Sequence, residues 1–390
     1  MVQAVVVSAP AVLSIENDRP MPTLRDNSLL VKVVSVGLNP TDWKNGLRSQ
    51  PGVTVGCDYA GIIEAIGPAV QKPFRVGDRV FGSVHGCNPE QPSDGAFAEH
   101  IIARADLATV IPENLTFQQA ATLGVSLVTI GQSLYQTLRL PPPPPTIHPE
   151  PTPSASAPAQ YILIYGGSTS VGTLAIQFAK LSGYTVLTTC SPQHESLLRT
   201  RGADHIYSYH DTSTPQRIRS ATADQLTLVL DTISTPETAS FCGNAMSSHG
   251  GDYTALLPGS PVPREDVRSR WTLAYTAGGY EFLFHGKRMP ACPEDRDFTV
   301  EWLATATRFL AEGVIVPHPV RVGDGGLNGV VNGLHALREG MVRGCPWGVL
   351  FGLASCWGVW LSDRRVGIWG VLPTQRWVNG MLQILMMGGV

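Results

Sequence analysis

The sequence predicts an α/β protein in which a β-rich domain is combined with a doubly wound parallel sheet. Short apolar runs broken by Gly, Pro and Asp fill the first hundred residues, a spacing typical of a compact β-rich domain. Residues 161–165 form an apolar run that leads into a small-residue turn and a helix-patterned segment, and residues 184–189 supply the next strand. The chain has 390 residues, enough for two domains of ordinary size.

The predicted elements follow in chain order. The β-rich part is expected to contain strands at residues 29–34, 60–66 and 79–81. Residues 118–140 then take a helical pattern, and later strands of the parallel sheet are expected at 226–231 and 250–257.

These elements suggest a discontinuous first domain. We expect it to span residues 1–125 and 265–345, with the parallel-sheet domain at 126–265. Residues 141–158 are rich in proline, which fixes φ and removes backbone donors. They are therefore predicted to form a surface insertion that is either a polyproline II helix or disordered. A ligand for a proline-recognition module is the alternative for this segment.

The turn at residues 166–172 has the composition of a phosphate-binding loop. Gly166, Gly167 and Gly172 leave the backbone open, and a helix start after them can stabilise a pyrophosphate through free N–H groups. The hydroxyls of residues 168–170 can donate further hydrogen bonds. A Rossmann-type dinucleotide-binding unit is therefore predicted, although the turn departs from G-x-G-x-x-G and a purely structural strand-turn-helix is the alternative.

The end of the second strand predicts which dinucleotide is bound. An NAD-specific unit places Asp or Glu roughly 20 residues beyond the glycines, and residues 189–194 contain no acid. Hydroxyls, the imidazole of His194 and the nearby Arg199 would instead favour a 2′-phosphate, so NADPH is the predicted cofactor. For both basic residues, an ordinary solvated helix start is the alternative.

Composition excludes several classes of protein. The net charge of −3 and the pI of about 6.4 give no basic excess for nucleic acid or an anionic membrane. The seven cysteines form no C-x-x-C pair, and residues 1–7 do not have the pattern of a secretory leader. No apolar stretch reaches the 18 or so residues of a membrane span. A cytoplasmic small-molecule enzyme with reduced thiols is expected.

Several motifs, in order, resemble the quinone-oxidoreductase and enoyl-reductase branch of the medium-chain dehydrogenase/reductase superfamily. They are residues 36–42 (VGLNPTD), 56–61 (GCDYAG), 74–82 (FRVGDRVFG), 95–100 (GAFAEH), the glycine turn and residues 325–340. This resemblance implies a GroES-like catalytic domain joined to a Rossmann nucleotide-binding domain. With residues 289–295 (MPACPED) and 317–320 (PHPV), the chain is most similar to the trans-acting enoyl reductases that serve fungal polyketide synthases.

The resemblance also implies a set of site residues. The cofactor contacts would be Thr41, Asp42, Trp43, Lys44, Gly166, Gly167, Ser168, Thr169, Ser170, Val171, Gly172, Ser191, Pro192, Gln193, His194, Tyr209, Leu256, Leu257, Val342 and Arg343. The acyl-binding residues would be Thr129, Ile130, Gly131, Gln132, Ser133, Leu134, Tyr135, Gln136, Tyr275, Thr276, Ala277, Gly278 and Gly279.

Zinc is not expected. Where zinc-dependent relatives have a ligating cysteine this chain has Asn39, and where they have Gly-His-Glu it has Gly56, Cys57 and Asp58. Cys87 is the single cysteine of the segment that would hold a structural zinc, and that site needs four ligands. Without a Lewis acid for alcohol oxidation, reduction of a polarised C=C bond is the expected chemistry.

Lys44 and Thr129 are the candidates for polar contact with the reacting end of the substrate. By the resemblance, a hydride passes from NADPH to the β-carbon of an unsaturated acyl thioester, and the enolate is then protonated. A solvated lysine and a threonine bonded to its own helix backbone are the respective alternatives. No proton donor is predicted.

The resemblance implies an acyl-carrier domain of a polyketide synthase or hybrid synthase as partner. Two other functions stay open: a general NADPH-dependent quinone or enone reductase, and a noncatalytic NADPH-binding scaffold. A monomer is expected, because prolines at residues 258–263 would interrupt the edge strand near Leu256 through which relatives dimerise.

The C-terminal segment departs from the family pattern. Residues 346–390 form an atypical Trp-rich tail, which suggests a translated intron or frameshift in place of the native last strand. Loss of that strand would leave an open sheet edge and exposed apolar surface, so a nonfunctional product is a further alternative. A mature transcript that encodes the tail would contradict this hypothesis.

Overall fold

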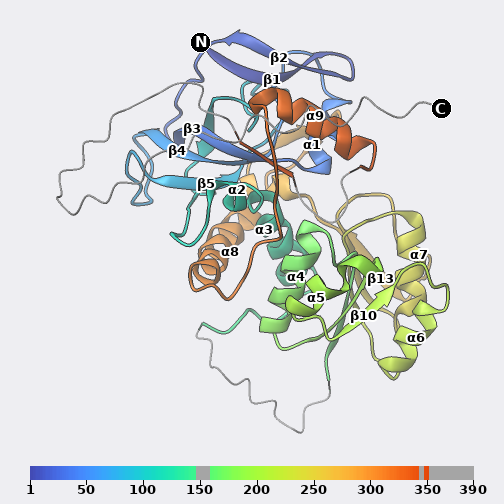
Figure 1. Ribbon diagram of the computed structural model, residues 1–390. Coiled ribbons are helices and arrows are strands. Elements are labelled where there is room, and N and C mark those ends of the chain that lie inside the picture. The colour runs from blue at the N-terminus through green and yellow to red at the C-terminus, as the bar shows by residue number, and fades with distance from the viewer. Residues whose placement is uncertain (146–158, 342–346, 351–390) are drawn as a thin grey trace, which may run out of the picture. The chain divides into compact units, whose positions relative to one another are not determined.

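The computed structural model describes residues 1–145, 159–341 and the backbone of residues 347–350 (Figure 1). Most of the predicted proline-rich insertion, the expected cofactor contacts Val342 and Arg343, and tail residues 351–390 lie outside this part of the chain.

A mixed, mainly antiparallel sheet forms the β-rich domain. Its order is β16-β17-β3-β4-β5-β7, and β6 also pairs with β3. The central strands β3 and β4 pair antiparallel along almost their full length, which places Val31, Val36 and Ile63 in the core. The strands are β3 (Ser28–Gly37), β4 (Asp58–Ile66), β5 (Arg79–Ser83), β6 (His100–Arg104), β7 (Thr109–Val110), β16 (Arg321–Gly323) and β17 (Trp347–Leu350).

Smaller elements surround this sheet. The hairpin of β1 (Val2–Ala9) and β2 (Val12–Arg19) lies next to α9 (Gly326–Arg338), as Figure 1 shows. The other elements in this part of the chain are α1 (Pro40–Gly46), α2 (Phe117–Ala120), β14 (Phe282–Phe284) and β15 (Lys287–Met289).

Strand β17 corrects one expectation about the C-terminus. Its backbone lies between β16 and β3, with Gly348 opposite Gly37 and Leu350 opposite Ser35. The predicted open edge at β3 is therefore wrong, because the first residues of the unusual tail form the strand that was expected to be missing.

The second sheet has six parallel strands in the order β10-β9-β8-β11-β12-β13. The chain runs outward from β8 in one direction and from β11 in the other, so the strand order reverses between them, where open α/β sheets bind ligands. The predicted doubly wound sheet is confirmed. Its strands are β8 (Tyr161–Tyr165), β9 (Thr185–Cys190), β10 (His205–Ser208), β11 (Leu228–Asp231), β12 (Gly251–Ala255) and β13 (Val267–Trp271).

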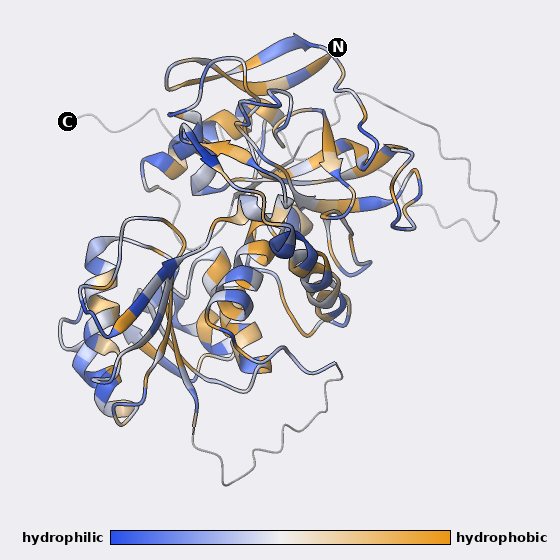
Figure 2. Ribbon diagram, turned by 180° about the vertical axis from the view of Figure 1, so that it is seen from behind, coloured by the Kyte–Doolittle hydropathy of each residue, from blue (hydrophilic) through white to orange (hydrophobic). Residues whose placement is uncertain are grey.

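Helices pack against this sheet, and Figure 2 shows both orange apolar and blue polar residues along their ribbons. They are α4 (Ser170–Leu181), α5 (Glu195–Thr200), α6 (Thr214–Ala221) and α7 (Pro236–Ala245), with the short 3₁₀-helix η2 (Pro192–His194) before α5. Among the described residues no helix is both long and apolar enough to cross a membrane.

The edge strand of this sheet is intact. Strand β13 pairs in parallel with β12 along its whole length, and the proline-containing residues 258–263 form the loop before it. The prediction that these prolines interrupt the edge strand is therefore wrong, since a proline removes a ladder donor only inside a strand. The monomeric state stays a prediction without that argument.

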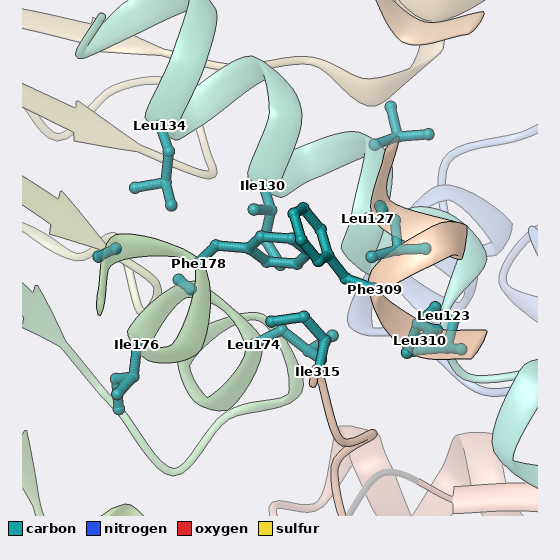
Figure 3. Close-up of a cluster of buried hydrophobic side chains, with 14 of the residues drawn as sticks. Leu123, Leu127, Ile130, Leu134, Leu174, Ile176, Phe178, Phe309, Leu310 and Ile315 are labelled. Carbon is teal, nitrogen blue, oxygen red and sulfur yellow. The ribbon is translucent and has the colours of Figure 1, made fainter. Parts of the chain in front are cut away.

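A large hydrophobic cluster packs α3 (Gly124–Ile130) and the π-helix η1 (Gly131–Thr137) against α4 and α8 (Pro293–Ala311). Figure 3 shows Leu127 and Ile130 beside Phe178 of α4 and Phe309 of α8, all almost completely buried. The cluster fixes the helix that carries the predicted acyl-binding residues.

Candidate active site

The glycine turn after β8 shapes the start of α4. Gly166 has a φ of +76°, which glycine adopts without strain, and a Cβ on Gly172 would lie 2.4 Å from the Gly166 carbonyl oxygen. Thr169 caps the helix, since its Oγ1 accepts the Gly172 N–H at 2.9 Å. The N–H groups of Ser170 and Val171 have no acceptor within the described chain, so they can bind a pyrophosphate.

A second group of predicted cofactor residues meets at the end of β9. The hydroxyls of Ser191 and Tyr209 lie 2.7 Å apart, although the two residues follow different strands. The strand ends in Cys190 without a carboxylate. Arg199 is exposed and donates to Glu195 at 2.6 Å, so its guanidinium is partly neutralised. The two hydroxyls and the guanidinium are groups that can donate hydrogen bonds to a ribose and its phosphate.

Helix α1 carries four predicted cofactor residues. The buried Asp42 accepts the Asn39 backbone N–H at 2.7 Å, and burial raises its pKa to about 7. Lys44 is half-buried, with its Nζ 5.7 Å from the centre of the Trp43 ring. Burial, and secondarily the charge of Arg48, lowers the pKa of Lys44. This lysine is not the freely solvated residue of the alternative interpretation.

Asn39 and Asp58 occupy the positions at which zinc-dependent relatives would have metal ligands. The Asn39 Nδ2 donates to Asp58 Oδ2 at 2.9 Å, and the Val125 N–H donates to Asp58 Oδ1 at 2.6 Å. Burial raises the pKa of Asp58 to about 8. The two side chains bond each other, and no cluster of three or more His, Cys, Asp or Glu suited to a metal occurs in the described ranges. These residues do not fit a catalytic zinc.

Tyr275 connects the predicted acyl-binding segment to α1. Its hydroxyl accepts from Asn45 Nδ2 at 2.9 Å and lies 3.3 Å from the Cys57 sulfur. Asn45 also donates to Thr41 Oγ1 at 3.2 Å. The Tyr275 ring stacks on His85 with centroids 4.2 Å apart, and burial lowers the pKa of His85 to about 4, which keeps that imidazole neutral.

The two predicted acyl-binding segments also bond each other. Gln132 Nε2 donates to Thr276 Oγ1 at 3.0 Å, and Thr276 in turn donates to Asp295. Gln136 donates to Asp295 from the next turn of η1 at 3.1 Å. The second segment lies in the 3₁₀-helix η3 (Ala274–Gly278), which ends at Gly279 in the left-handed region. This network holds η1 and η3 together.

Thr129 is buried on α3, three residues before Gln132. Its hydroxyl has no hydrogen bond among the described residues, so the alternative of a bond to its own helix backbone is not what the structure has. One turn earlier, Ser126 Oγ lies 3.1 Å from Ser170 Oγ of the glycine-turn helix. Helix α3 therefore contacts both α4 and, through Asp58, the β-rich domain.

Hydrogen bonds thus connect α4, α3, α1 and η3, and they include the predicted residues Ser170, Thr41, Tyr275, Thr276 and Gln132. The Ser191–Tyr209 pair is separate from this network. Leu256 and Leu257 follow the carboxyl end of β12, and the Leu256 N–H donates to Ser234 Oγ at 2.8 Å. The predicted residue Ser168 lies in the turn after β8, and Pro192, Gln193 and His194 form the 3₁₀-helix η2 that follows β9.

The sequence interpretation missed several members of this region. Asn45, His85 and Ser126 were not predicted, and Cys57 and Asp58 were considered only as replaced metal ligands. For Asp58 a signal was available in the sequence: Asn39 and Asp58 are both polar and stand at metal-ligand positions. Two polar groups that have no ion between them can bond each other directly.

Comparison with known proteins agrees with this architecture. Residues 25–113 match the alcohol dehydrogenase GroES-like domain, and residues 170–254 match the zinc-binding dehydrogenase family. The quinone oxidoreductase of Escherichia coli, solved in complex with NADPH, has a TM-score of 0.67 at 17% identity, covering 89% of this chain and 99% of that chain. The quinone oxidoreductase of Coxiella burnetii gives 0.66 at 22%, covering 90% and 99%. At these identities the likeness shows the fold alone.

The fold and the site define a medium-chain dehydrogenase/reductase whose parallel sheet is of the type that binds a nicotinamide dinucleotide, as the sequence predicted. Trans-enoyl reductase resD of Aspergillus sclerotiorum is 46% identical over 349 residues, which are 88% of this chain and 98% of that protein. Trans-enoyl reductase TOXD of Cochliobolus carbonum is 52% identical over 282 residues, which are 72% and 91%. The chain therefore belongs to the trans-enoyl reductase family, and the resemblance found in the sequence is confirmed.

Proposed function

We propose that this protein is an NADPH-dependent, zinc-independent enoyl reductase that acts in trans on α,β-unsaturated thioesters attached to the carrier domain of a polyketide synthase. The observation that carries the proposal is the Asn39–Asp58 hydrogen bond at the positions of the metal ligands. Alcohol oxidation needs a Lewis acid there, whereas reduction of a conjugated C=C bond needs only a positioned hydride and a stabilised enolate.

The chain's own residues have distinct roles in this proposal. NADPH, when bound, supplies the hydride. The Ser170 and Val171 N–H groups bind its pyrophosphate, and Ser191, Tyr209 and Arg199 bind the 2′-phosphate. The switch point lies between β8 and β11, and the loop after the neighbouring strand β12, with Leu256 and Leu257, holds the nicotinamide end.

Lys44 and Thr129 act on the substrate. Both donate to the thioester oxygen as it gains negative charge, and Asp58 links α1, which carries Lys44, to α3, which carries Thr129. Orientation requires the β-carbon within about 3 to 3.5 Å of the hydride donor. Protonation of the α-carbon is assigned to no residue.

The test is NADPH oxidation by the purified full chain with crotonyl-pantetheine. The variants Lys44→Met and Thr129→Val should each lower kcat/KM on the order of 10²-fold, the size typical for loss of one oxyanion donor. The NADPH dissociation constant should change little in Thr129→Val, whereas Lys44→Met should also weaken NADPH binding, because Lys44 is among the predicted cofactor contacts. Lys32→Met, at an exposed lysine of β3, is the matched control and should be fully active.

Cofactor choice is tested separately. Arg199→Gln should raise the KM for NADPH several-fold and leave the KM for NADH unchanged, because only NADPH has the 2′-phosphate. Equal effects on both cofactors would remove Arg199 from the site.

Substrate comparison separates the alternatives. Equal kcat/KM for free enones or quinones and for carrier-bound enoyl thioesters would indicate a general reductase. NADPH binding without oxidation of NADPH by any of these substrates would indicate a scaffold. A cytoplasmic location is proposed because the described cysteines, several of them buried, are all free thiols.

A further inference from the structure

A cavity of about 390 Å³ opens beside the predicted acyl-binding segments. Its walls come from η1, from the end of β13 and the residues after it, and from the start of α8. It is lined by Gln132, Gln136, Thr137, Arg139, Arg270, Trp271, Thr272, Leu273, Thr276, Met289 and Asp295. Only three of these, Gln132, Gln136 and Thr276, were predicted from the sequence, so most of this cavity has no assigned role.

The two cations of the cavity are largely uncommitted. Arg139 is exposed and makes no hydrogen bond or ion pair within the described part of the chain, although it helps to lower the pKa of Asp252. Arg270 makes only long hydrogen bonds, to the Thr137 carbonyl at 3.5 Å and to Asp252 at 3.4 Å, and Arg268 already donates to both oxygens of that carboxylate, at 2.7 and 2.5 Å. Two guanidinium groups are thus available to an anion at the solvent side.

The interior of the cavity is built for a different chemistry. Gln132 is 4% exposed, and its Oε1 has no hydrogen-bond partner. A buried acceptor without a donor is unfavourable, so a ligand N–H or O–H would stabilise it. Trp271 and Met289 add apolar surface, and the one acidic group, Asp295, is already bonded to Gln136 and Thr276.

We propose that this cavity binds the phosphopantetheine arm of the carrier, with its phosphate on Arg139 and Arg270 and an amide N–H of the arm on Gln132 Oε1. This inference rests on the proposed function and names the part of the substrate that the site recognises. The order of groups fits: an anion at the exposed arginines, then a chain bearing amide donors beside Gln132, then the thioester towards Thr276 of η3.

The anion is not a phosphate of the dinucleotide. The predicted sites for those phosphates follow β8 and β9, whereas Arg270 lies on β13, the opposite edge strand of the six-stranded sheet. The two anion sites are therefore separated by the width of the strands between them.

The experiment compares crotonyl-pantetheine with crotonyl-phosphopantetheine, which differ only in the phosphate, in NADPH-dependent turnover. For the unchanged protein the KM of the phosphorylated substrate should be about tenfold lower, a size expected for charge-assisted bonds that remain partly in water. The ratio should fall towards one in the double variant Arg139→Gln, Arg270→Gln and should shrink at high ionic strength.

Two further variants make the pattern specific. Gln132→Met should raise the KM of both substrates alike, since both contain the amide groups. Arg217→Gln removes an exposed arginine of α6 that pairs with Asp211 at 2.9 Å outside the cavity, and it should leave the ratio unchanged.

A KM ratio near one in the unchanged protein, or a tenfold ratio that survives in the double arginine variant, would overturn the inference while leaving the enoyl reductase intact. If neither substrate is turned over, the proposed function fails. The cavity is then tested by calorimetry with phosphopantetheine and pantetheine, where a preference for the phosphorylated compound that requires the two arginines supports the site and equal binding refutes it.

Discussion

Exchanging Asn39 and Asp58 should preserve the site, whereas changing either residue alone should weaken it. The two side chains join the start of α1 to strand β4, and Asp58 also accepts the Val125 N–H of α3. Because α1 carries Lys44 and α3 carries Thr129, this pair sets the spacing of both proposed substrate contacts.

The expected loss for Asp58→Asn follows from these contacts. At pH 7 a carboxyl with a pKa of about 8 is mostly protonated, so the change removes little charge. The amide introduced at position 58 can accept the Val125 N–H through its oxygen only by turning its NH₂ towards Asn39. The NH₂ groups of the two amides then face each other. One buried donor then lacks an acceptor, which should lower the free energy of unfolding by about 1–3 kcal/mol.

The double variant Asn39→Asp, Asp58→Asn restores every bond with the roles exchanged. The carboxyl introduced at position 39 accepts from the amide introduced at position 58, and that amide still accepts the Val125 N–H. Aspartate is also a favoured N-cap for α1. The assay is a double-mutant cycle of melting temperature and kcat at pH 7. Each kcal/mol corresponds to about 2–4 °C in a domain of 150–250 residues. Recovery of at least about 1 kcal/mol in the double variant is expected.

Strict additivity would refute this reasoning. If the double variant is destabilised by the sum of the two single changes, the 2.9 Å contact contributes no coupling and Asp58 acts only through its burial. Asp18→Asn, at an exposed carboxyl of β2, controls for the loss of an acid as such and should leave the melting temperature nearly unchanged.

Three other results are expected. Burial raises the pKa of Asp42 to about 7 and of Asp58 to about 8 in the folded chain. The free energy of unfolding should therefore fall as pH rises from about 4 to about 8. Denaturant titrations at pH 5 and pH 8 check this, and Asp58→Asn should make the free energy of unfolding depend less on pH. Trp302→Phe removes the 2.7 Å donation from its Nε1 to the Leu127 carbonyl, which still accepts the Gly131 N–H, and should destabilise by about 0.5–1.5 kcal/mol, measured by urea unfolding, with no loss if water replaces the indole. Gly131→Ala should destabilise by about 1–3 kcal/mol, because a Cβ there would lie 2.5 Å from the Trp302 ring; an unchanged melting temperature would show that the ring can move aside.

Local features of this protein were predictable from the sequence, because they depend on neighbouring residues. The glycine turn, the strands on either side of it and the absence of an acid after β9 follow from short stretches with clear periodicity. The same is true of the short strands in the first hundred residues.

Contacts between distant segments were not predictable in the same way. Asn45 and Tyr275 are 230 positions apart, and no local pattern indicates that their side chains meet. In η1, Gly131 packs closely against the Trp302 ring, and a glycine inside a helical pattern was the only trace of this contact in the sequence. The proline loop was misjudged because position along the chain does not reveal whether a proline lies within a strand or before it.

Strand β17 has a consequence for how the protein is made. It pairs with β3, which leaves the ribosome about 300 residues earlier, so the mixed sheet cannot be completed until almost the whole chain has been synthesised. At typical rates of 5–20 residues per second, this interval is roughly 15 to 60 s. During that time β6 can pair with residues 28–32 of β3, but residues 35–37 on the same edge have no partner strand. Binding of this short segment by a chaperone, or by a second nascent chain, competes with the late arrival of β17.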